Sequence, residues 1–283
     1  MTINFRRILS GATIINYEKV EEKFNLHPKR ICFSSFHKNS LKKKSGDDII
    51  GTLTVPFKES IADIFKKETE LVFFHTRYDK YWCPIKNEED FEKVQSFFNK
   101  YRNSVFLRDS LDISIALAEN FDENDERTDL GELEKAAKYD GCDKSLNKIV
   151  KLACNFIIST PYYKKTKYIC SVPPSTKNSE SFPNILVNKI AAKLELSDIS
   201  SQVSWVNNKP PLKEVTFKEK WELLERTDVK VEGEFKNVNI ILVDDLYQSG
   251  TTIQYIAMKL KAAGILKVYG LSIVKSRKNT DNI

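Results

Sequence analysis

Two adjacent carboxylates stand shortly before a run of hydroxyl and glycine residues, and together they could bind a phosphorylated sugar. The carboxylates are Asp244 and Asp245, and the run is Gln248-Ser249-Gly250-Thr251-Thr252. Hydroxyl groups in the run can donate to phosphate oxygens, and Gly250 lets the backbone approach a ligand closely. Carboxylates accept hydrogen bonds from vicinal hydroxyls. The spacing therefore predicts a sugar-phosphate site, with the sugar beside the acids and its phosphate on the run.

A strand and a helix are expected to hold these residues. The continuous apolar run Ile240–Val243 predicts a strand buried on both faces of a parallel sheet. Apolar residues then recur at helical spacing, at Ile253, Ile256, Ala257 and Leu260, before Gly264. The first turn of a helix carries a partial positive charge and attracts anions, and open α/β sheets bind ligands at the carboxyl ends of their strands. A Rossmann-like or flavodoxin-like strand with acids at its tip is the alternative.

Further strands and helices alternate from residue 130 onward. We expect a helical segment Leu130–Ser159 broken at Asp140–Gly141, strands Lys167–Val172, Val203–Val206 and Val268–Val274, and a helix Asn184–Leu196. This alternation predicts right-handed crossovers and an α/β fold with a mostly parallel, doubly wound sheet.

The first 120 residues predict a small α+β domain of unknown role. Helices are expected over Glu18–Phe24 and Glu88–Tyr101, and strands over Gly51–Val55 and Leu71–Phe74. The segment His75–Pro84 mixes aromatic and charged residues; it is either a recognition surface or a strand end whose aromatic residues cap the core.

An acidic stretch, Glu119–Asp129, is poor in apolar residues and predicts a domain boundary. We therefore expect an N-terminal domain over residues 1–120, a linker over 121–129 and a second domain over 130–283. The alternative is a long surface loop within one domain.

Composition and charge narrow the class of protein. The chain has 283 residues, of which 41% are hydrophobic and 30% charged, and its formal net charge is +6. This predicts a normal buried core and a mild preference for phosphorylated ligands. The five cysteines form no C-x-x-C pair, which argues against a zinc ribbon or disulfide framework. With no apolar run long enough to span a membrane and no signal-peptide pattern, we expect a cytoplasmic protein without a membrane partner.

The segment Ile241–Thr252 resembles the signature with which type I phosphoribosyltransferases bind phosphoribosyl pyrophosphate (PRPP). Three upstream segments appear in an order similar to ComF-type phosphoribosyltransferase-like proteins, namely Ala137–Gly141, Cys170–Pro174 and Lys209–Leu224. The likeness covers roughly residues 130–276. Two features depart from the ComF pattern: Asn178–Asn184 replaces an arginine-glycine-phenylalanine-asparagine run, and the N-terminal cysteine ribbon is absent.

This resemblance implies a type I phosphoribosyltransferase fold and Mg-PRPP-dependent transfer of ribose 5-phosphate to a nitrogenous acceptor, with release of pyrophosphate. Asp244 and Asp245 would face the ribose hydroxyls and Mg²⁺. The 5′-phosphate would lie on Gln248, Ser249, Gly250, Thr251 and Thr252. The pyrophosphate side would be formed by Pro174, Ser175, Thr176 and Lys177. A lysine of a closing loop, with Lys209 and Lys213 as first candidates beside Lys218 and Lys220, would supply a cation to the leaving pyrophosphate.

Each assignment has a purely structural alternative. One carboxylate could cap the following turn, and the hydroxyl run could be an ordinary helix N-cap. The Pro-Pro loop could be a rigid turn, and the lysines could belong to a solvated surface. Lys275 and Arg277 follow the last strand and could reach phosphate.

Two residues bear on the activity. The Gln248 amide cannot act as a general base, which disfavours the proton exchange with 6-oxopurines for which related salvage enzymes use an aspartate. Tyr247 could stack on a base or fill space under the helix. The alternative function is a non-catalytic PRPP- or nucleotide-binding regulatory module, which could be DNA-associated like competence-linked relatives. A homodimer is also open.

Overall fold

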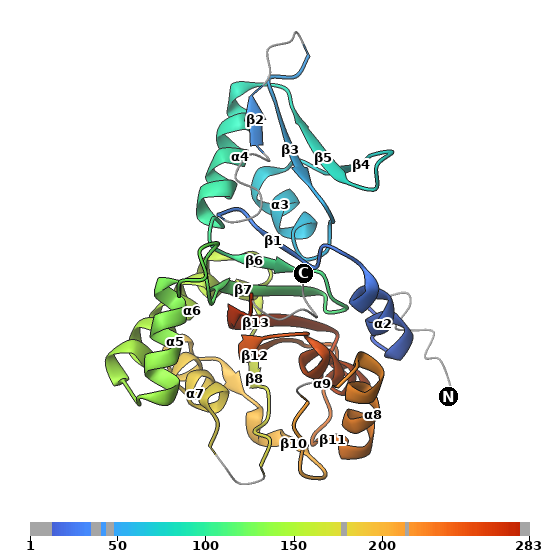
Figure 1. Ribbon diagram of the computed structural model, residues 1–283, viewed down its shortest axis with the longest axis vertical. Coiled ribbons are helices and arrows are strands. Elements are labelled where there is room, and N and C mark those ends of the chain that lie inside the picture. The colour runs from blue at the N-terminus through green and yellow to red at the C-terminus, as the bar shows by residue number, and fades with distance from the viewer. Residues whose placement is uncertain (1–12, 35–40, 44–47, 177–179, 213–214, 278–283) are drawn as a thin grey trace.

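The computed structural model describes residues 13–34, 41–43, 48–176, 180–212 and 215–277. It has two parts stacked along the long axis of the molecule (Figure 1). The larger part holds a seven-stranded sheet between layers of helices. The smaller part is a four-stranded sheet with two helices, and it rises from one edge of the larger part.

The central sheet has the strand order β1-β6-β7-β13-β12-β8-β9. Its strands are β1 (Arg30–Cys32), β6 (Val105–Leu107), β7 (Ile113–Glu119), β8 (Tyr168–Ser171), β9 (Ser197–Asp198), β12 (Asn239–Tyr247) and β13 (Lys267–Lys275). Five neighbouring strands, β7, β13, β12, β8 and β9, pair in parallel. Strands β6 and β1 add an antiparallel edge next to β7. The predicted mostly parallel sheet is confirmed.

Helices cover both faces of this sheet (Figure 1). One layer consists of α5 (Asp129–Tyr139), α6 (Asp143–Ser159) and α7 (Phe182–Leu194). The other consists of α9 (Thr251–Ala262), with α8 (Phe217–Thr227) and α2 (Tyr17–Asn25) beside it. The chain leaves β8 into α7 on one face and leaves β12 into α9 on the other, so a topological switch point lies between β8 and β12. The fold class is therefore α/β and doubly wound, as predicted.

Strand β12 is buried on both faces. Ile240 and Leu242 belong to the apolar cluster on the α9 side, and Ile241 and Val243 to the cluster on the α5–α7 side. All four side chains are 0% exposed. The apolar run was therefore interpreted correctly as a two-sided strand.

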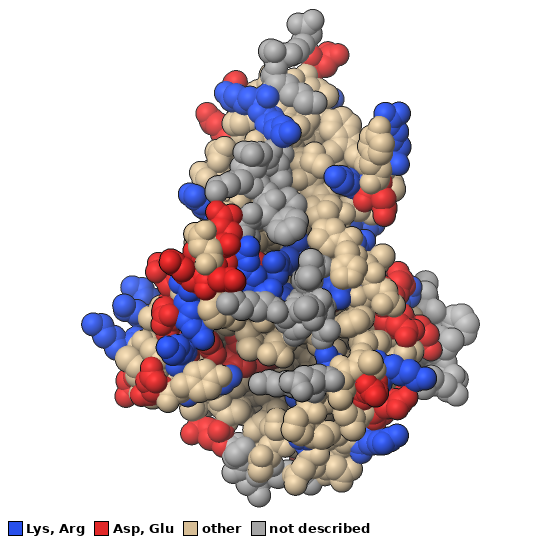
Figure 2. All heavy atoms as spheres, in the orientation of Figure 1, with Lys and Arg blue, Asp and Glu red and all other residues tan. Residues whose placement is uncertain are grey.

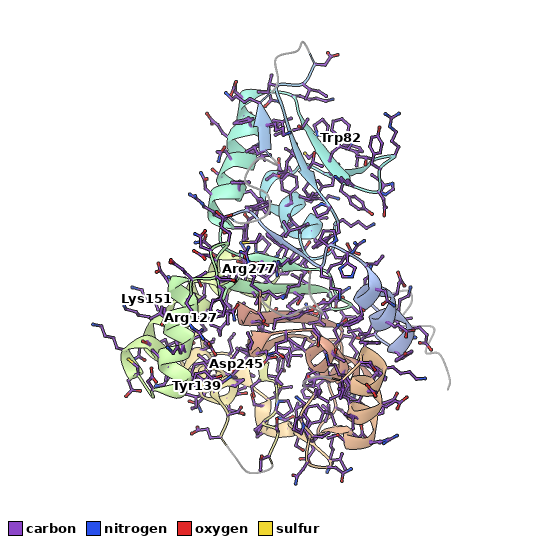
Figure 3. All side chains as sticks on the ribbon, viewed as in Figure 1. Trp82, Arg127, Tyr139, Lys151, Asp245 and Arg277 are labelled. Carbon is purple, nitrogen blue, oxygen red and sulfur yellow. The ribbon has the colours of Figure 1, made fainter. Side chains whose placement is uncertain are left out.

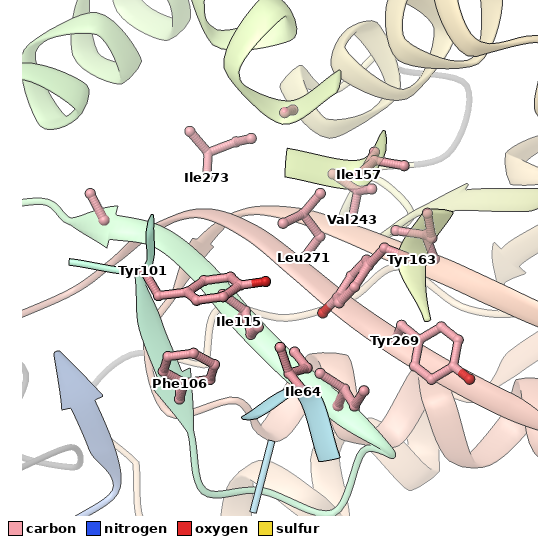
Figure 4. Close-up of a cluster of buried hydrophobic side chains, with 14 of the residues drawn as sticks. Ile64, Tyr101, Phe106, Ile115, Ile157, Tyr163, Val243, Tyr269, Leu271 and Ile273 are labelled. Atoms are coloured by element: carbon pink, nitrogen blue, oxygen red, sulfur yellow. The ribbon is translucent and has the colours of Figure 1, made fainter. Parts of the chain in front are cut away.

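The core continues from the sheet into the smaller part of the molecule. Figure 4 shows Ile64 and Phe106 close to Leu271 and Ile115, which belong to the same cluster. Ile64 lies on α3 (Ala62–Thr69), outside the central sheet. The two parts thus share one apolar core.

The predicted domain boundary at residues 121–129 is wrong in its position. Strand β7 lies before that boundary, yet it pairs with β13 from Ile113↔Tyr269 to Glu119↔Lys275. Strands β1 and β6 extend the same sheet. A strand buried in a parallel sheet needs backbone partners along its length, and β7 supplies them for β13. Three strands of the first 120 residues therefore belong to the unit that holds β12.

The acidic stretch is an ordered turn between β7 and α5. Phe121 bridges to Arg127, and the Asp122 carboxylate accepts hydrogen bonds from the amides of Asn124 and Glu126 at 2.8 and 3.0 Å. Figure 2 shows acidic side chains gathered in this area of the surface. The alternative, a surface loop within one unit, agrees with the structure.

The smaller α+β part is formed by described residues between 41 and 100, a shorter range than the predicted 1–120. Its sheet has the order β2-β3-β5-β4, made of β2 (Leu41–Lys43), β3 (Gly51–Val55), β5 (Tyr81–Ile85) and β4 (Phe74–His75). Helices α3 and α4 (Glu88–Lys100) pack against each other beside it. The expected strand Leu71–Phe74 is only partly present, since β4 begins at Phe74.

The remaining elements lie outside the central sheet. Strands β10 (Val203–Trp205) and β11 (Val229–Val231) form an antiparallel ribbon of their own. Short 3-10 helices span Tyr163–Lys165 (η1) and Ser200–Gln202 (η2). Within the described ranges, no helix combines the length and apolar character needed to cross a membrane.

Candidate active site

A cavity of about 370 Å³ opens at the carboxyl ends of β8 and β12, at the switch point between them. Its walls combine the β12–α9 loop, the loop after β8, the start of α7, and lysines from α5, α8 and the segment before α8. The lining includes the predicted residues Pro174, Ser175, Lys209, Asp244, Asp245, Gln248, Ser249, Gly250, Thr251 and Thr252. The fold therefore brings these predicted residues together around one cavity.

The β12–α9 loop has the geometry of an anion cradle. Gly250 is the N-cap of α9 and has a φ of +74°, in the left-handed region that favours glycine. The hydroxyl oxygens of Ser249 and Thr251 lie 3.0 Å apart. Because α9 begins at Thr251 beside the cavity, its first-turn N–H groups and its partial positive charge are available to an anion there.

The acidic pair ends β12, and its two carboxylates have different surroundings. Asp244 Oδ1 accepts a hydrogen bond from the Asp245 amide at 3.0 Å. Asp245 is 8% exposed, and its Oδ2 lies 2.5 Å from Lys138 Nζ. Figure 3 shows Asp245 at the end of β12 on the side of α5. Burial, and then the neighbouring Asp245 carboxylate, raise the pKa of Asp244 well above its usual range.

Lys138 is a site residue to which sequence reasoning assigned no role. It lies on α5, where its Nζ is also 3.9 Å from Glu134 Oε1. Burial disfavours its charged form, but the Asp245 carboxylate outweighs that effect, so the pKa of Lys138 is raised. Lys138 therefore remains a cation and neutralises Asp245. One signal could have pointed to it, because Lys138 shares a helical face with Glu134 and Leu130, which are buried.

Two further lysines approach the cavity from the other side. The Lys209 amide donates to the Ser175 carbonyl at 3.2 Å, and its Nζ lies 5.4 Å from the centroid of the Trp205 ring. Burial lowers the pKa of Lys209, and Asp244 and Asp245 oppose that shift. Lys220 of α8 is buried and also lines the cavity. Lys218, also a candidate, is exposed on α8 and lies outside the lining.

Several predicted residues of the pyrophosphate side are not placed in the cavity. Thr176 is described and does not belong to the lining, although Pro174 and Ser175 before it do. Lys177 and Lys213 lie outside the described residues.

Lys275 and Arg277 do not line the cavity, contrary to the expectation that they reach phosphate. Lys275 is 0% exposed, and its Nζ donates to the Ser276 carbonyl. The backbone amide of Arg277 donates instead to the Asn120 side chain, and its guanidinium to Glu119, at the carboxyl end of β7. Strand β13 lies between β12 and β7 and pairs with each of them. The end of β13 therefore places Lys275 and Arg277 on the β7 side of β12.

Tyr247 fills space behind the loop. Its side chain is 5% exposed, and its hydroxyl donates to Asp109 Oδ2 at 3.0 Å. Asp109 belongs to the connection between β6 and β7. Tyr247 also contributes to the cavity lining, and its burial agrees with the interpretation that it fills space under the helix.

The charges of the cavity suit a ligand with more than one anionic group. The described lining residues include three lysines, Lys138, Lys209 and Lys220, and two acids, Asp244 and Asp245. The α9 N-terminus adds partial positive charge. A phosphate can lie on the loop, and a second anion can lie near Lys209. Lys138 pairs with Asp245 and not with Asp244. The Asp244 carboxyl group can therefore accept hydrogen bonds from hydroxyls.

No protein-family model matches this chain. No curated protein matches it either.

Several solved structures resemble part of the chain. Adenine phosphoribosyltransferase from Leishmania tarentolae is 11% identical, with a TM-score of 0.33 over 50% of this chain and 76% of that one. Purine phosphoribosyltransferase from Pyrococcus horikoshii is 12% identical, with a TM-score of 0.31 over 49% and 87%. Adenine phosphoribosyltransferase from Trypanosoma brucei, solved with AMP, pyrophosphate and ribose-5-phosphate, is 14% identical, with a TM-score of 0.33 over 48% and 66%. At such scores we draw no functional inference from the likeness and use the site geometry alone.

Proposed function

We propose that this protein is a Mg-PRPP-dependent phosphoribosyltransferase, which transfers ribose 5-phosphate to a nitrogenous acceptor and releases pyrophosphate. The observation that carries the proposal is the β12–α9 unit, in which Asp244 and the anion cradle at Gly250 line the same cavity as Lys209. The cavity thus offers a phosphate position and a hydroxyl acceptor from this unit, and a separate cation from Lys209. Those are the groups that PRPP requires.

In the proposed reaction, the bond between the anomeric carbon and pyrophosphate breaks and the acceptor nitrogen bonds to that carbon. Positive charge develops on the ribose ring while both ends of the substrate remain anionic, so catalysis depends on positioning and electrostatics. The loop Ser249–Thr252 would hold the 5′-phosphate, and Asp244 would accept hydrogen bonds from ribose hydroxyls. Lys209 and Ser175 would lie on the pyrophosphate side.

The donor set fits Mg²⁺ only as an ion carried by the substrate. Within the described residues, no group of three or more His, Cys, Asp or Glu side chains could hold a metal ion. Mg²⁺ is commonly bound by one or two carboxylates together with substrate phosphates and waters. Asp244 can supply such a carboxylate, whereas Asp245 is paired with Lys138. When bound, the ion would neutralise charge on the leaving pyrophosphate.

Calorimetric titration with PRPP and Mg²⁺ tests the binding site. Wild type is expected to bind, and Asp244→Asn to bind at least tenfold more weakly, because an amide cannot replace the carboxylate that would bind Mg²⁺ and accept from a ribose hydroxyl, a contact of about 1.5–3 kcal/mol. Asp143→Asn, an exposed substitution in the first turn of α6, serves as the matched control and should bind like wild type. Wild type that produces no heat would refute the proposal.

Pyrophosphate release then separates transfer from binding alone. With PRPP saturating, a panel of bases and amines is screened for acceptor-dependent release. Release with at least one acceptor, lost in Asp244→Asn, supports the transferase. Tight PRPP binding with no release from any acceptor would favour the regulatory module instead.

A further inference from the structure

The connection between β6 and β7, residues 108–112, lies against the β12–α9 loop although it is far away in sequence. Asp109 and Ser110 are 4% and 5% exposed, and they contact Tyr247 and Gln254. Neither of the two residues lines the cavity. The connection thus packs behind the loop that we propose holds the 5′-phosphate, and it is a candidate support for that loop.

The first contact runs from Asp109 through Tyr247 to Gly250. The Tyr247 hydroxyl donates to Asp109 Oδ2 at 3.0 Å, while Asp109 Oδ1 accepts from the Leu111 amide at 3.0 Å. A Cβ added at Gly250 would lie 2.1 Å from the Tyr247 hydroxyl oxygen. The tyrosine therefore packs directly against the α-carbon of the helix N-cap, and Asp109 holds the tyrosine in that place.

The second contact runs from Ser110 through Gln254 to the same glycine. Gln254 is 3% exposed; its Oε1 accepts from the Ser110 amide at 2.9 Å, and its Nε2 donates to the Gly250 carbonyl at 3.2 Å. The backbone N–H of Gln254 also donates to the Gly250 carbonyl, at 3.1 Å. In a trans peptide the carbonyl and the following N–H point in opposite directions. Because Gln254 holds the Gly250 carbonyl, the Thr251 N–H points the opposite way, out of the N-terminal end of α9.

The connection has anchors of its own. The Ser110 hydroxyl donates to the Lys19 carbonyl of α2 at 3.2 Å. Asp112 forms ion pairs with Lys261 and Lys267 at 2.7 and 2.9 Å, and it accepts from the Val268 amide at 2.9 Å. The support is consequently fixed to the sheet and to the far end of α9, so it can restrain the loop rather than move with it.

We propose that Asp109 and Ser110 are positioning residues for the phosphate loop, acting through Tyr247 and Gln254 on Gly250. The inference rests on the proposed function of that loop. It assigns a role in ligand binding to a segment of the chain that precedes the predicted domain boundary. It also gives the Tyr247 hydroxyl a role at the end of β12.

The test compares single-group deletions with a matched control. Tyr247→Phe and Gln254→Leu each remove one of the two contacts. Tyr163→Phe removes another buried tyrosine hydroxyl, which donates to the Gly270 carbonyl at 2.6 Å and has no contact with the loop among the described residues. Asp109→Asn is the conservative variant, because its oxygen can accept from Leu111 while its amide donates to the Tyr247 oxygen.

Two readouts are measured on each folded full-length variant. The first is the Kd for ribose 5-phosphate by calorimetry, and the second is amide hydrogen exchange of residues 249–252 without ligand. Tyr247→Phe and Gln254→Leu should each raise the Kd about five- to tenfold, the effect of one lost hydrogen bond, and speed exchange in the loop. Asp109→Asn and Tyr163→Phe should match wild type in both readouts.

Failure of this inference and failure of the proposed function give different results. If wild type binds ribose 5-phosphate and the two deletions bind it equally well with unchanged exchange, the positioning role is refuted. If wild type binds neither ribose 5-phosphate nor PRPP, the proposed function fails, and the role in ligand binding inferred here fails with it. The exchange data would then still show whether the connection orders the loop.

Discussion

At the scale of single residues, Lys138 changes the interpretation of the acidic pair. From the sequence, Asp244 and Asp245 appear equivalent. In the structure Asp245 is paired with Lys138 at 2.5 Å, while Asp244 lines the cavity with a pKa raised by burial and by its neighbour. Both acids line the cavity, but they have different surroundings: Asp245 connects α5 to the end of β12 through Lys138, and in the proposed function Asp244 is the acid that accepts from the ribose.

Replacing Lys138 should be costly because it leaves the Asp245 carboxylate buried without its cation. We expect Lys138→Met to lower the free energy of unfolding by about 1–2 kcal/mol, below the cost of breaking a fully buried pair because the Lys138 side chain is 27% exposed. Urea unfolding measures this. Lys135→Met, an exposed change on the same helix, is the control. Equal losses in both variants would contradict the assigned ion pair.

Asp109 should make stability depend on pH. Burial raises its pKa from 3.8 to about 6, against smaller opposing effects of hydrogen bonds from Ser114, Leu111 and Tyr247, and the nearby Glu59 adds to the rise. Because the folded state binds the Asp109 proton more tightly than the unfolded state does, protonation of Asp109 stabilises the fold. This stabilisation is fully present below the unfolded pKa and is lost as the pH rises through about 6. A shift of this size corresponds to about 3 kcal/mol.

Asp109→Asn removes that titration. Its free energy of unfolding should change less between pH 4 and pH 7 than that of wild type, so the variant gains relative stability as pH rises. Urea unfolding at several pH values measures the difference, and the other carboxyls contribute equally to both proteins. Parallel pH profiles would show that Asp109 titrates normally.

At the scale of elements, the β12–α9 unit depends on a close approach at Gly250. The residue has a positive φ, and its α-carbon packs on Tyr247. Backbone conformation and packing thus both require glycine there. The hydroxyl run is an N-terminal loop of α9, as predicted, but its shape is maintained by side chains behind it.

Gly250→Ala should destabilise the protein more than Gly141→Ala. Both glycines have a positive φ, +74° and +63°, but a Cβ at Gly141 meets nothing within 4 Å. Gly141→Ala therefore reports the backbone strain alone, about 1 kcal/mol or somewhat more, whereas Gly250→Ala adds the overlap with Tyr247, which costs about 1–3 kcal/mol further. Denaturant unfolding of both variants measures the difference. Losses of the same size would argue against close packing under Gly250.

At the scale of the whole molecule, the site is supported by strands on both sides of the acidic turn. The cavity lies at β8 and β12, β13 separates β12 from β7, and the connection that supports the loop follows β6. Residues before 120 are thus part of the unit that forms the site. The smaller α+β part continues the same core.

A fragment of residues 120–283 should not fold independently. Removing β7 leaves the β13 edge from Tyr269 to Lys275 without a partner and exposes apolar side chains of the shared core. Circular dichroism and size-exclusion chromatography should show an unfolded or aggregated fragment beside a folded full chain. A cooperative unfolding transition of the fragment would contradict this expectation and restore the predicted boundary.

Local elements could be predicted well from the sequence because their signals lie within a few residues. The continuous apolar run in β12, the break between α5 and α6 at Gly141, and the amphipathic α4 are of this kind. The order of the strands could not be predicted, because pairing between β7 and β13 joins residues more than 150 positions apart and leaves no periodic trace. The domain boundary was predicted at the acidic turn for a related reason, because a linker and a tight surface turn have similar exposed polar compositions.

Sequence patterns predict the α/β class and the strand–loop–helix unit from Asn239 to Gly264, with hydroxyl and glycine residues close to two acids. These features follow from hydrophobic period and local backbone chemistry. The folded chain alone shows that Lys138 pairs with Asp245, that Lys275 is buried away from the cavity, and that the Tyr247 hydroxyl donates to Asp109. Such contacts depend on which distant elements pack together, and burial then sets the charge and role of each side chain.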